Sequence, residues 1–182
     1  GYPADVLDRI PTSAIESFAG VGYFFDLADL EAGERVVDLG SGSGTDVFFA
    51  AERVGPSGRV VGIDFTVEQL EKARRIADEG GYSQVELREG RIEDLPVEDA
   101  GCECVISNGV INLAPEKERV FAEAARVLTP GGRLAIADIV SEQQLKESIV
   151  CDADLWASCI GGAAQEDAYR EAIEAAGLRI DQ

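Results

Sequence analysis

The chain has 182 residues, 46% of them apolar, which predicts a single globular domain with a full hydrophobic core. Its 16 basic and 35 acidic residues give a net charge of −19, which argues against nucleic acid as a partner because phosphates would repel such a chain. The same charge argues against binding to an anionic membrane, and no apolar run reaches the ~20 residues of a membrane span. Four cysteines without a charged-then-apolar leader predict reduced thiols in a cytoplasmic protein.

Arginine supplies most of the positive charge, because the chain has only three lysines, Lys72, Lys117 and Lys146. A carboxylate-rich, lysine-poor surface is typical of a salt-adapted, halophilic protein, whose self-repulsion is screened at high ionic strength. An ordinary acidic protein is the alternative. The chain has no histidine, so any mechanism must work without an imidazole base or metal ligand.

Strands and helices alternate along the chain, which predicts an α/β fold with a doubly wound, mostly parallel sheet and helices on both faces. Residues 1–33 read as an N-terminal helical segment, 34–138 as the core, 139–165 as a cap over the site, and 166–182 as a C-terminal helix and strand. Within these segments we expect strands at 35–39, 59–63, 85–89, 104–107, 133–138 and from 177, and helices at 45–54, 67–79, 115–128 and 166–176.

Residues 36–46 are the most informative segment, because an apolar strand enters a G-x-G-x-G turn at positions 40–44. Glycine has no side chain, so such a turn lets the backbone approach a bound nucleoside closely. Asp64 ends the next expected strand, about 20 positions further on, where a carboxylate suits two ribose hydroxyls. The glycines alone would also fit a dinucleotide site.

The glycine spacing, Asp38 ahead of the loop, and the later segment at 128–132 (LTPGG) together resemble the motifs of the Rossmann-like methyltransferases that use S-adenosylmethionine (SAM). The resemblance implies a seven-stranded sheet and SAM as the cofactor. An NAD-dependent oxidoreductase is a distant alternative, since the glycine spacing differs from G-x-G-x-x-G.

Ligands of open α/β sheets bind beyond the carboxyl ends of the strands, and the resemblance assigns cofactor residues there. Asp46 is expected to contact the cofactor's ammonium group. Phe65 would lie against the adenine, and the alternative is a buried side chain without a ligand. Glu93 would accept a hydrogen bond from the adenine amino group, and the alternative is a solvated run of charged residues. The full predicted set is Asp38, Gly40, Ser41, Gly42, Asp46, Asp64, Phe65, Thr66, Gln69, Arg91, Ile92, Glu93, Asn108 and Gly109.

Residues 105–117 and 156–163 are similar to segments of the arsenite methyltransferases, as are 40–44 and 90–95. In that family thiolates bind soft As(III), whose lone pair attacks the sulfonium methyl group without a general base. The resemblance implies that Cys159 is a thiolate ligand and that Asn108 lies where cofactor and acceptor meet, so these two are the predicted catalytic residues. No metal cofactor is expected.

The chain departs from the family at Gly109 and at residues 20–22, where a cysteine is common and none is present. Cys151, eight residues before Cys159, is either a substitute ligand or a packed apolar residue. We expect a SAM-dependent methyltransferase for a small-molecule acceptor, as a monomer or homodimer. The alternatives are an enzyme for an apolar organic acceptor of the quinone or sterol type, with Asp138 or a tyrosine removing a proton, and a non-catalytic SAM-binding module.

Overall fold

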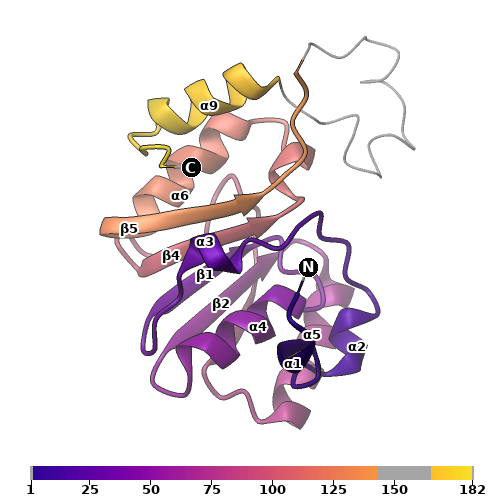
Figure 1. Ribbon diagram of the computed structural model, residues 1–182. Helices are drawn as coiled ribbons and strands as arrows, with labels where there is room; N and C mark the ends of the chain where they lie inside the picture. The colour runs from indigo at the N-terminus through magenta and orange to yellow at the C-terminus, as the bar shows by residue number, and fades with distance from the viewer. Residues whose placement is uncertain (1, 143–164, 182) are drawn as a thin grey trace.

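The computed structural model describes residues 2–142 and 165–181 (Figure 1). Most of the expected elements form within two or three residues of their predicted bounds; the strand expected at 133–138 begins five residues earlier, at Leu128, and the other exceptions are given below. In chain order they are α1 (Ala4–Leu7), α2 (Thr12–Ile15), α3 (Phe25–Ala28), β1 (Arg35–Leu39), α4 (Thr45–Val54), β2 (Arg59–Asp64), α5 (Val67–Gly80), β3 (Val85–Glu89), β4 (Cys102–Asn108), the 3-10 helix η1 (Ile111–Leu113), α6 (Lys117–Val127), β5 (Leu128–Ala137) and α9 (Glu166–Ala175).

The described residues form a five-stranded sheet in the order β3-β2-β1-β4-β5, and every neighbouring pair of strands is parallel. The expectation of seven strands is therefore wrong for the described part of the chain. A further strand was expected from residue 177. Gly177 instead forms a turn (φ +84°), and residues 178–180 pair with no strand in the described part of the chain. The strand order reverses between β1 and β4, which is where open sheets of this kind form a ligand crevice.

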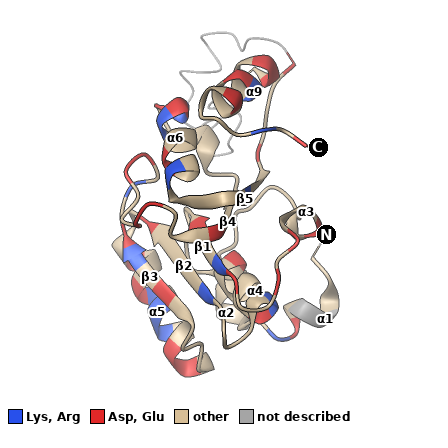
Figure 2. Ribbon diagram, turned by 90° about the vertical axis from the view of Figure 1, so that its left-hand side faces the viewer, with Lys and Arg blue, Asp and Glu red and all other residues tan. Residues whose placement is uncertain are grey.

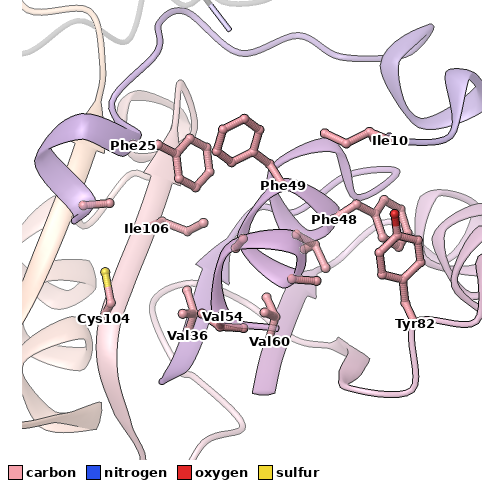
Figure 3. Close-up of a cluster of buried hydrophobic side chains, with 14 of the residues drawn as sticks. Ile10, Phe25, Val36, Phe48, Phe49, Val54, Val60, Tyr82, Cys104 and Ile106 are labelled. Atoms are coloured by element: carbon pink, nitrogen blue, oxygen red, sulfur yellow. The ribbon is translucent and has the colours of Figure 1, made fainter. Parts of the chain in front are cut away.

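The two faces of the sheet bury separate clusters of apolar side chains, because successive strand residues point to opposite sides. Val36 of β1 belongs to the cluster that contains Phe48 and Phe49 of α4 and Phe25 of α3, shown in Figure 3. Val37 belongs to the other cluster, with α6 and α9. Figure 2 shows acidic and basic residues interspersed along α5, and acidic residues along α9.

The N-terminal helices are single turns of four residues each, so the helical segment expected at residues 1–33 is only partly helical. Pro11 sits between α1 and α2, where it cannot continue a helix begun before it. The chain from 17 to 24 is then irregular, so it can follow the surface of the sheet end. Among the described residues, no helix is long and apolar enough to cross a bilayer.

Cys102 and Cys104 do not act as a ligand pair, although they are two residues apart on β4. The pairing of β4 with β5 shifts register between them, and Cys102 packs in the cluster with α6 while Cys104 packs in the cluster with α4. Burial raises the pKa of each thiol to about 12. Both are core side chains in the protonated form.

Candidate cofactor-binding site

A cavity of about 300 Å³ lies at the carboxyl ends of β1, β2 and β4. Because parallel strands end at the same edge of the sheet, residues far apart in the sequence meet there. Most of the predicted cofactor residues line this cavity: Asp38, Gly40, Ser41, Gly42, Asp46, Asp64, Thr66, Gln69, Asn108 and Gly109. Ser17, Phe18, Ala19 and Gly20 of the N-terminal segment also line it, and the sequence did not predict them.

The glycine loop after β1 is fastened to the end of β2. The backbone N–H groups of Gly40 and Ser41 both donate to the carbonyl of Ile63, at 2.8 and 2.9 Å. Gly40 and Gly42 have φ values of +71° and +53°, a conformation that favours glycine. A Cβ at Gly62 would lie 2.9 Å from Cβ of Ser41, so this glycine lets the loop pack on β2.

Asp64 is oriented by two backbone hydrogen bonds. Gly42 N–H donates to Oδ2 at 2.8 Å, and Thr66 N–H donates to Oδ1 at 2.8 Å. A carboxylate oxygen has two lone pairs, so each oxygen keeps one acceptor site. This arrangement fixes the plane of the carboxylate while leaving both oxygens able to accept from the hydroxyls of a ribose.

Asp38 and Ser41 are buried side chains that line the cavity. Ser41 Oγ has no hydrogen-bond partner among the described residues, as is also true of Ser107 Oγ and the Asn112 amide, which do not line the cavity. Burial raises the pKa of Asp38 well above its usual range, and the nearby carboxylates of Asp46 and Asp64 raise it further. Because buried polar groups in proteins are normally paired, Ser41 Oγ is a group at the cavity that a ligand could satisfy.

Asp46, in the first turn of α4, is held by two side chains from distant parts of the chain. Its Oδ1 accepts from the Tyr2 hydroxyl at 2.5 Å and its Oδ2 from Asn108 Nδ2 at 3.0 Å. Burial raises the pKa of Asp46 from 3.8 to about 6, and the hydrogen bonds from Tyr2 and Asn108 limit the rise. Burial and Asp46 also raise the pKa of Tyr2, so its hydroxyl stays protonated.

Asn108 lies at the cavity as expected, but protein groups already occupy its amide. Its Oδ1 accepts from the N–H groups of Val21 and Gly22 at 2.8 and 3.2 Å, and its Nδ2 lies 2.9 Å from the Gly22 carbonyl. The side chain therefore fastens the N-terminal segment to the end of β4. A direct contact with an acceptor would require these bonds to break.

Phe65, Arg91, Ile92 and Glu93 lie outside the set of residues that line the cavity. Phe65 is 73% exposed, so the alternative of a buried core side chain is wrong there. Glu93 is buried, with Arg91 at 3.1 Å, and is therefore not part of a solvated charge run. Ile92 is half-buried and packs against the cluster of α6 and α9. The adenine contacts proposed for this loop stay predictions.

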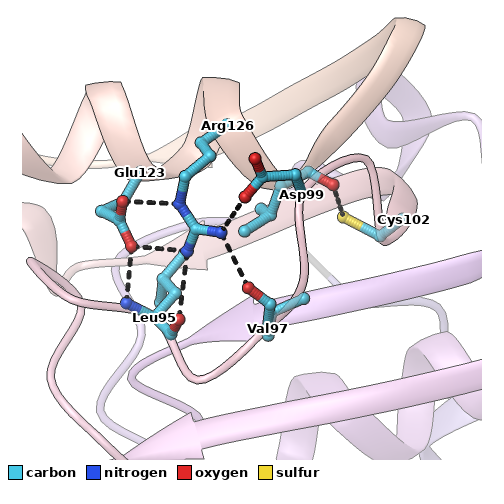
Figure 4. Close-up of polar contacts among 7 residues, drawn as sticks. Leu95, Val97, Asp99, Cys102, Glu123 and Arg126 are labelled. Atoms are coloured by element: carbon cyan, nitrogen blue, oxygen red, sulfur yellow. Dashed lines mark hydrogen bonds and ion pairs between the residues drawn. The ribbon is translucent and has the colours of Figure 1, made fainter.

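The loop that follows Glu93 is clamped by α6, as Figure 4 shows. Arg126 donates to the carbonyls of Leu95 and Val97 at 3.1 and 2.9 Å and pairs with Asp99 at 2.7 Å. Glu123 accepts from Leu95 N–H at 2.7 Å and pairs with Arg126 at 2.7 Å. Sequence reasoning missed this clamp, because it depends on a contact between a helix and a loop about 30 residues apart in sequence.

The side of the cavity near the end of β4 is apolar. Val110 and Leu113 line it, and a Cβ at Gly109 would lie 3.1 Å from Cγ1 of Val21. Val21 is 40% exposed and Leu113 is 44% exposed. The structure does not describe Cys159, nor Cys151 and Trp156.

The polar groups of the cavity suit SAM better than a dinucleotide. Three of its lining side chains, Asp38, Asp46 and Asp64, are carboxylates, and none of the described lining residues is lysine or arginine. SAM carries a sulfonium and an ammonium group, which carboxylates attract, whereas the pyrophosphate of a dinucleotide would be repelled. Asp64 with the glycine loop would hold the nucleoside, and Asp38 and Asp46 would face the cationic end.

Comparison with known proteins identifies the family of the chain. A family profile described as a methyltransferase domain matches residues 30–177. An arsenite methyltransferase of Halobacterium salinarum is 42% identical over 178 residues, which are 98% of this chain and 45% of the relative. The human arsenite methyltransferase is 40% identical over 137 residues, 70% of this chain and 36% of the relative.

A solved structure shows the same likeness. The arsenic(III) S-adenosylmethionine methyltransferase of Chlamydomonas reinhardtii matches with a TM-score of 0.87 and 37% identity, over 97% of this chain and 62% of that one. The chain spans less than half the length of the curated arsenite methyltransferases that it matches. Family profile, relatives and cavity agree, and the chain belongs to the SAM-dependent methyltransferase family, in which it is arsenite-methyltransferase-like.

Proposed function

We propose that this chain binds SAM in the cavity and transfers its methyl group to a small acceptor, and that the acceptor is trivalent arsenic. The supporting observation is the carboxylate-lined cavity at the ends of β1, β2 and β4, in a chain that is 42% identical to an arsenite methyltransferase over 98% of its length. Bound SAM supplies an electrophilic methyl group on a positively charged sulfur.

The protein's own residues contribute position and exclusion of water. Asp64 accepts from the ribose hydroxyls, and Asp38 and Asp46 face the ammonium group. Residues 17–20 form the wall of the cavity on the side of the N-terminal segment. The lone pair of As(III) would attack in line with the sulfur–methyl bond, so that the As–C bond forms as the S–C bond breaks and sulfur leaves with the bonding electron pair as a neutral thioether. The arsenic would become a methylated cation, formally As(V), and a thiol supplied with the arsenite would return it to As(III). No residue has to remove a proton, and holding both reactants in line would lower the barrier.

Cys159 is proposed as a thiolate ligand of the arsenic, since sulfur ligands suit soft As(III). This role rests on the likeness of residues 156–163 to the arsenite methyltransferases. Cys151 is the candidate for a second ligand. With charge −19 the protein is proposed to act in a salt-rich cytoplasm, as a monomer or homodimer, without nucleic acid or membrane as a partner.

An apolar organic acceptor is the second candidate, and the apolar side of the cavity supports it. Val21 and Gly109 occupy the segments in which we expected family cysteines, and Val110 and Leu113 continue the apolar lining. A cysteine at 109 would also be strained, because the position has φ +73°. If neither acceptor is methylated while SAM still binds, the chain is a binding module.

Transfer from SAM with a labelled methyl group tests these proposals. The assay compares arsenite plus a thiol, a neutral apolar acceptor, and protein alone, in high salt. Methylated arsenic that is lost in Cys159→Ser and kept in the core control Cys104→Val supports the arsenite proposal. Bound SAM without methylated arsenic refutes it, and a methylated organic product then supports the second candidate.

A further inference from the structure

Tyr2 connects the cavity carboxylate Asp46 to the N-terminal wall of the cavity. Its hydroxyl lies 2.5 Å from Asp46 Oδ1, 3.0 Å from Asn108 Nδ2 and 3.5 Å from the Gly22 carbonyl. These partners are on α4, at the end of β4, and in the segment before α3. One phenol group therefore touches three elements that surround the cavity.

The ring of Tyr2 is held by aromatic neighbours independently of the hydroxyl. Phe18, Tyr23, Phe25 and Phe49 pack around it with centroid distances of 5.4, 5.2, 6.1 and 5.5 Å, all edge-to-face. Edge-to-face pairs of this kind stabilise the packing of the rings beyond their burial alone. A Tyr2→Phe change keeps this packing and removes the hydroxyl alone.

The wall that Tyr2 supports fits closely against the cavity. A Cβ at Gly20 would lie 2.2 Å from Phe18 Cζ and 2.6 Å from Asn108 Nδ2, so the backbone at Gly20 lies directly on the Asn108 amide. Ser17 Oγ lies 2.7 Å from Ser43 Oγ of the glycine loop. The wall therefore touches both the glycine loop and the Asn108 side chain that bonds Asp46.

We propose that Tyr2 is a positioning residue for SAM binding, whose hydroxyl sets the orientation of the Asp46 carboxylate and keeps residues 17–22 closed over the cavity. The proposal rests on the proposed binding of SAM. Tyr2 is not among the residues that line the cavity. It acts through Asp46, which faces the cofactor, and through Asn108, which holds the wall.

The test compares Tyr2→Phe with Tyr23→Phe by calorimetric titration of SAM into the full chain. Tyr23 belongs to the same aromatic cluster, but its hydroxyl lies 3.4 Å from the exposed Asp26 and not at Asp46. We expect Tyr2→Phe to raise the Kd for SAM about tenfold, because a hydrogen bond to a charged group is worth about 1.5 kcal/mol. Tyr23→Phe should leave the Kd unchanged.

The pH dependence of the Kd for SAM distinguishes the proposed role from a general weakening of the fold, which would not shift the pH at which affinity is lost. Asp46 faces the Tyr2 hydroxyl, the Asn108 amide and the Asp38 carboxylate. The Tyr2 hydrogen bond lowers the pKa of Asp46, so its removal raises that pKa. The acid-side loss of SAM affinity, near pH 6 in the wild type, should move to higher pH in Tyr2→Phe.

An unchanged Kd in Tyr2→Phe, or an equal rise in both variants, overturns the proposal. A weaker Kd without any movement of the pH profile also overturns it, because the effect would then come from looser packing. If the wild-type chain itself does not bind SAM, the proposed function fails first, and that result is distinct from either outcome for Tyr2.

Discussion

Replacing Asp46 by asparagine distinguishes the effect of its buried charge on folding stability from its proposed role in SAM binding. The carboxylate is 5% exposed and its pKa is about 6 in the folded protein, against 3.8 for an ordinary aspartate. An asparagine has nearly the same shape. Its amide can still accept from Asn108 and donate to the Tyr2 oxygen, but it carries no charge to desolvate.

The difference between the folded and unfolded pKa of Asp46 gives the direction and size of the expected change in the free energy of unfolding. A carboxyl group whose pKa is raised by folding contributes stability below the unfolded value of 3.8, and that contribution is lost as the pH rises through about 6. At 1.36 kcal/mol for each pH unit, the loss is about 3 kcal/mol above pH 7. Asp46→Asn should therefore raise the free energy of unfolding by up to about 3 kcal/mol at pH 8 and by little near pH 4.

Urea denaturation of the cofactor-free protein between pH 4.5 and 8, at constant high salt, measures this difference. The same variant should bind SAM more weakly at pH 8, because the ammonium group loses an anionic partner. If Asp46→Asn lowers the stability by equal amounts at pH 5 and pH 8, the charged hydrogen bonds of Asp46 outweigh its desolvation, and the reasoning is wrong.

Three further changes have defined outcomes. Arg126→Ala should lower the free energy of unfolding by about 2–3 kcal/mol, since it leaves loop carbonyls and a carboxylate without their donor; a loss within 0.5 kcal/mol would contradict this. Gly62→Ala should lower the free energy of unfolding by about 1–3 kcal/mol and weaken SAM binding, because the new Cβ would meet Ser41. The control Gly81→Ala places a Cβ at a position with positive φ but with no neighbour within 4 Å, so it should leave SAM binding intact. Raising KCl from about 0.1 to 1 M, which shortens the Debye length from about 10 to 3 Å, should raise the melting temperature; a flat response would count against salt adaptation.

The core of the fold, the glycine loop and Asp64 could be predicted from short-range pattern, whereas the other cavity residues came from the resemblance to the methyltransferases. The apolar runs of β1 and β2 and the glycine loop indicate where these strands end, and parallel pairing then brings Asp38 and Asp64 to one edge. The φ values of Gly40 and Gly42 agree with the need for glycine there. The helix at 45–54 forms at its predicted bounds.

The parts that sequence reasoning missed depend on contacts between distant residues. Tyr2 bonds to Asp46 and Asn108, which are 44 and 106 positions away, and no local periodicity marks such a contact. The bonds of the Asn108 amide to the N-terminal segment were missed for the same reason, and the predicted place of Asn108 between cofactor and acceptor stays a prediction. The seven strands were a property of the resemblance, and the described residues pair only five of them.

The carboxylates of the cavity lower the stability of the cofactor-free protein. Asp38 is buried beside the carboxylates of Asp46 and Asp64, and both burial and these neighbours disfavour its ionised form, so ionising it lowers the stability of the fold. A bound cation lowers the pKa of the carboxylates around it and removes most of that cost. SAM should therefore stabilise the fold more at pH 8 than at pH 5, since only the ionised carboxylates gain a partner. The charge that makes the free protein less stable is then the same charge that selects a positively charged cofactor.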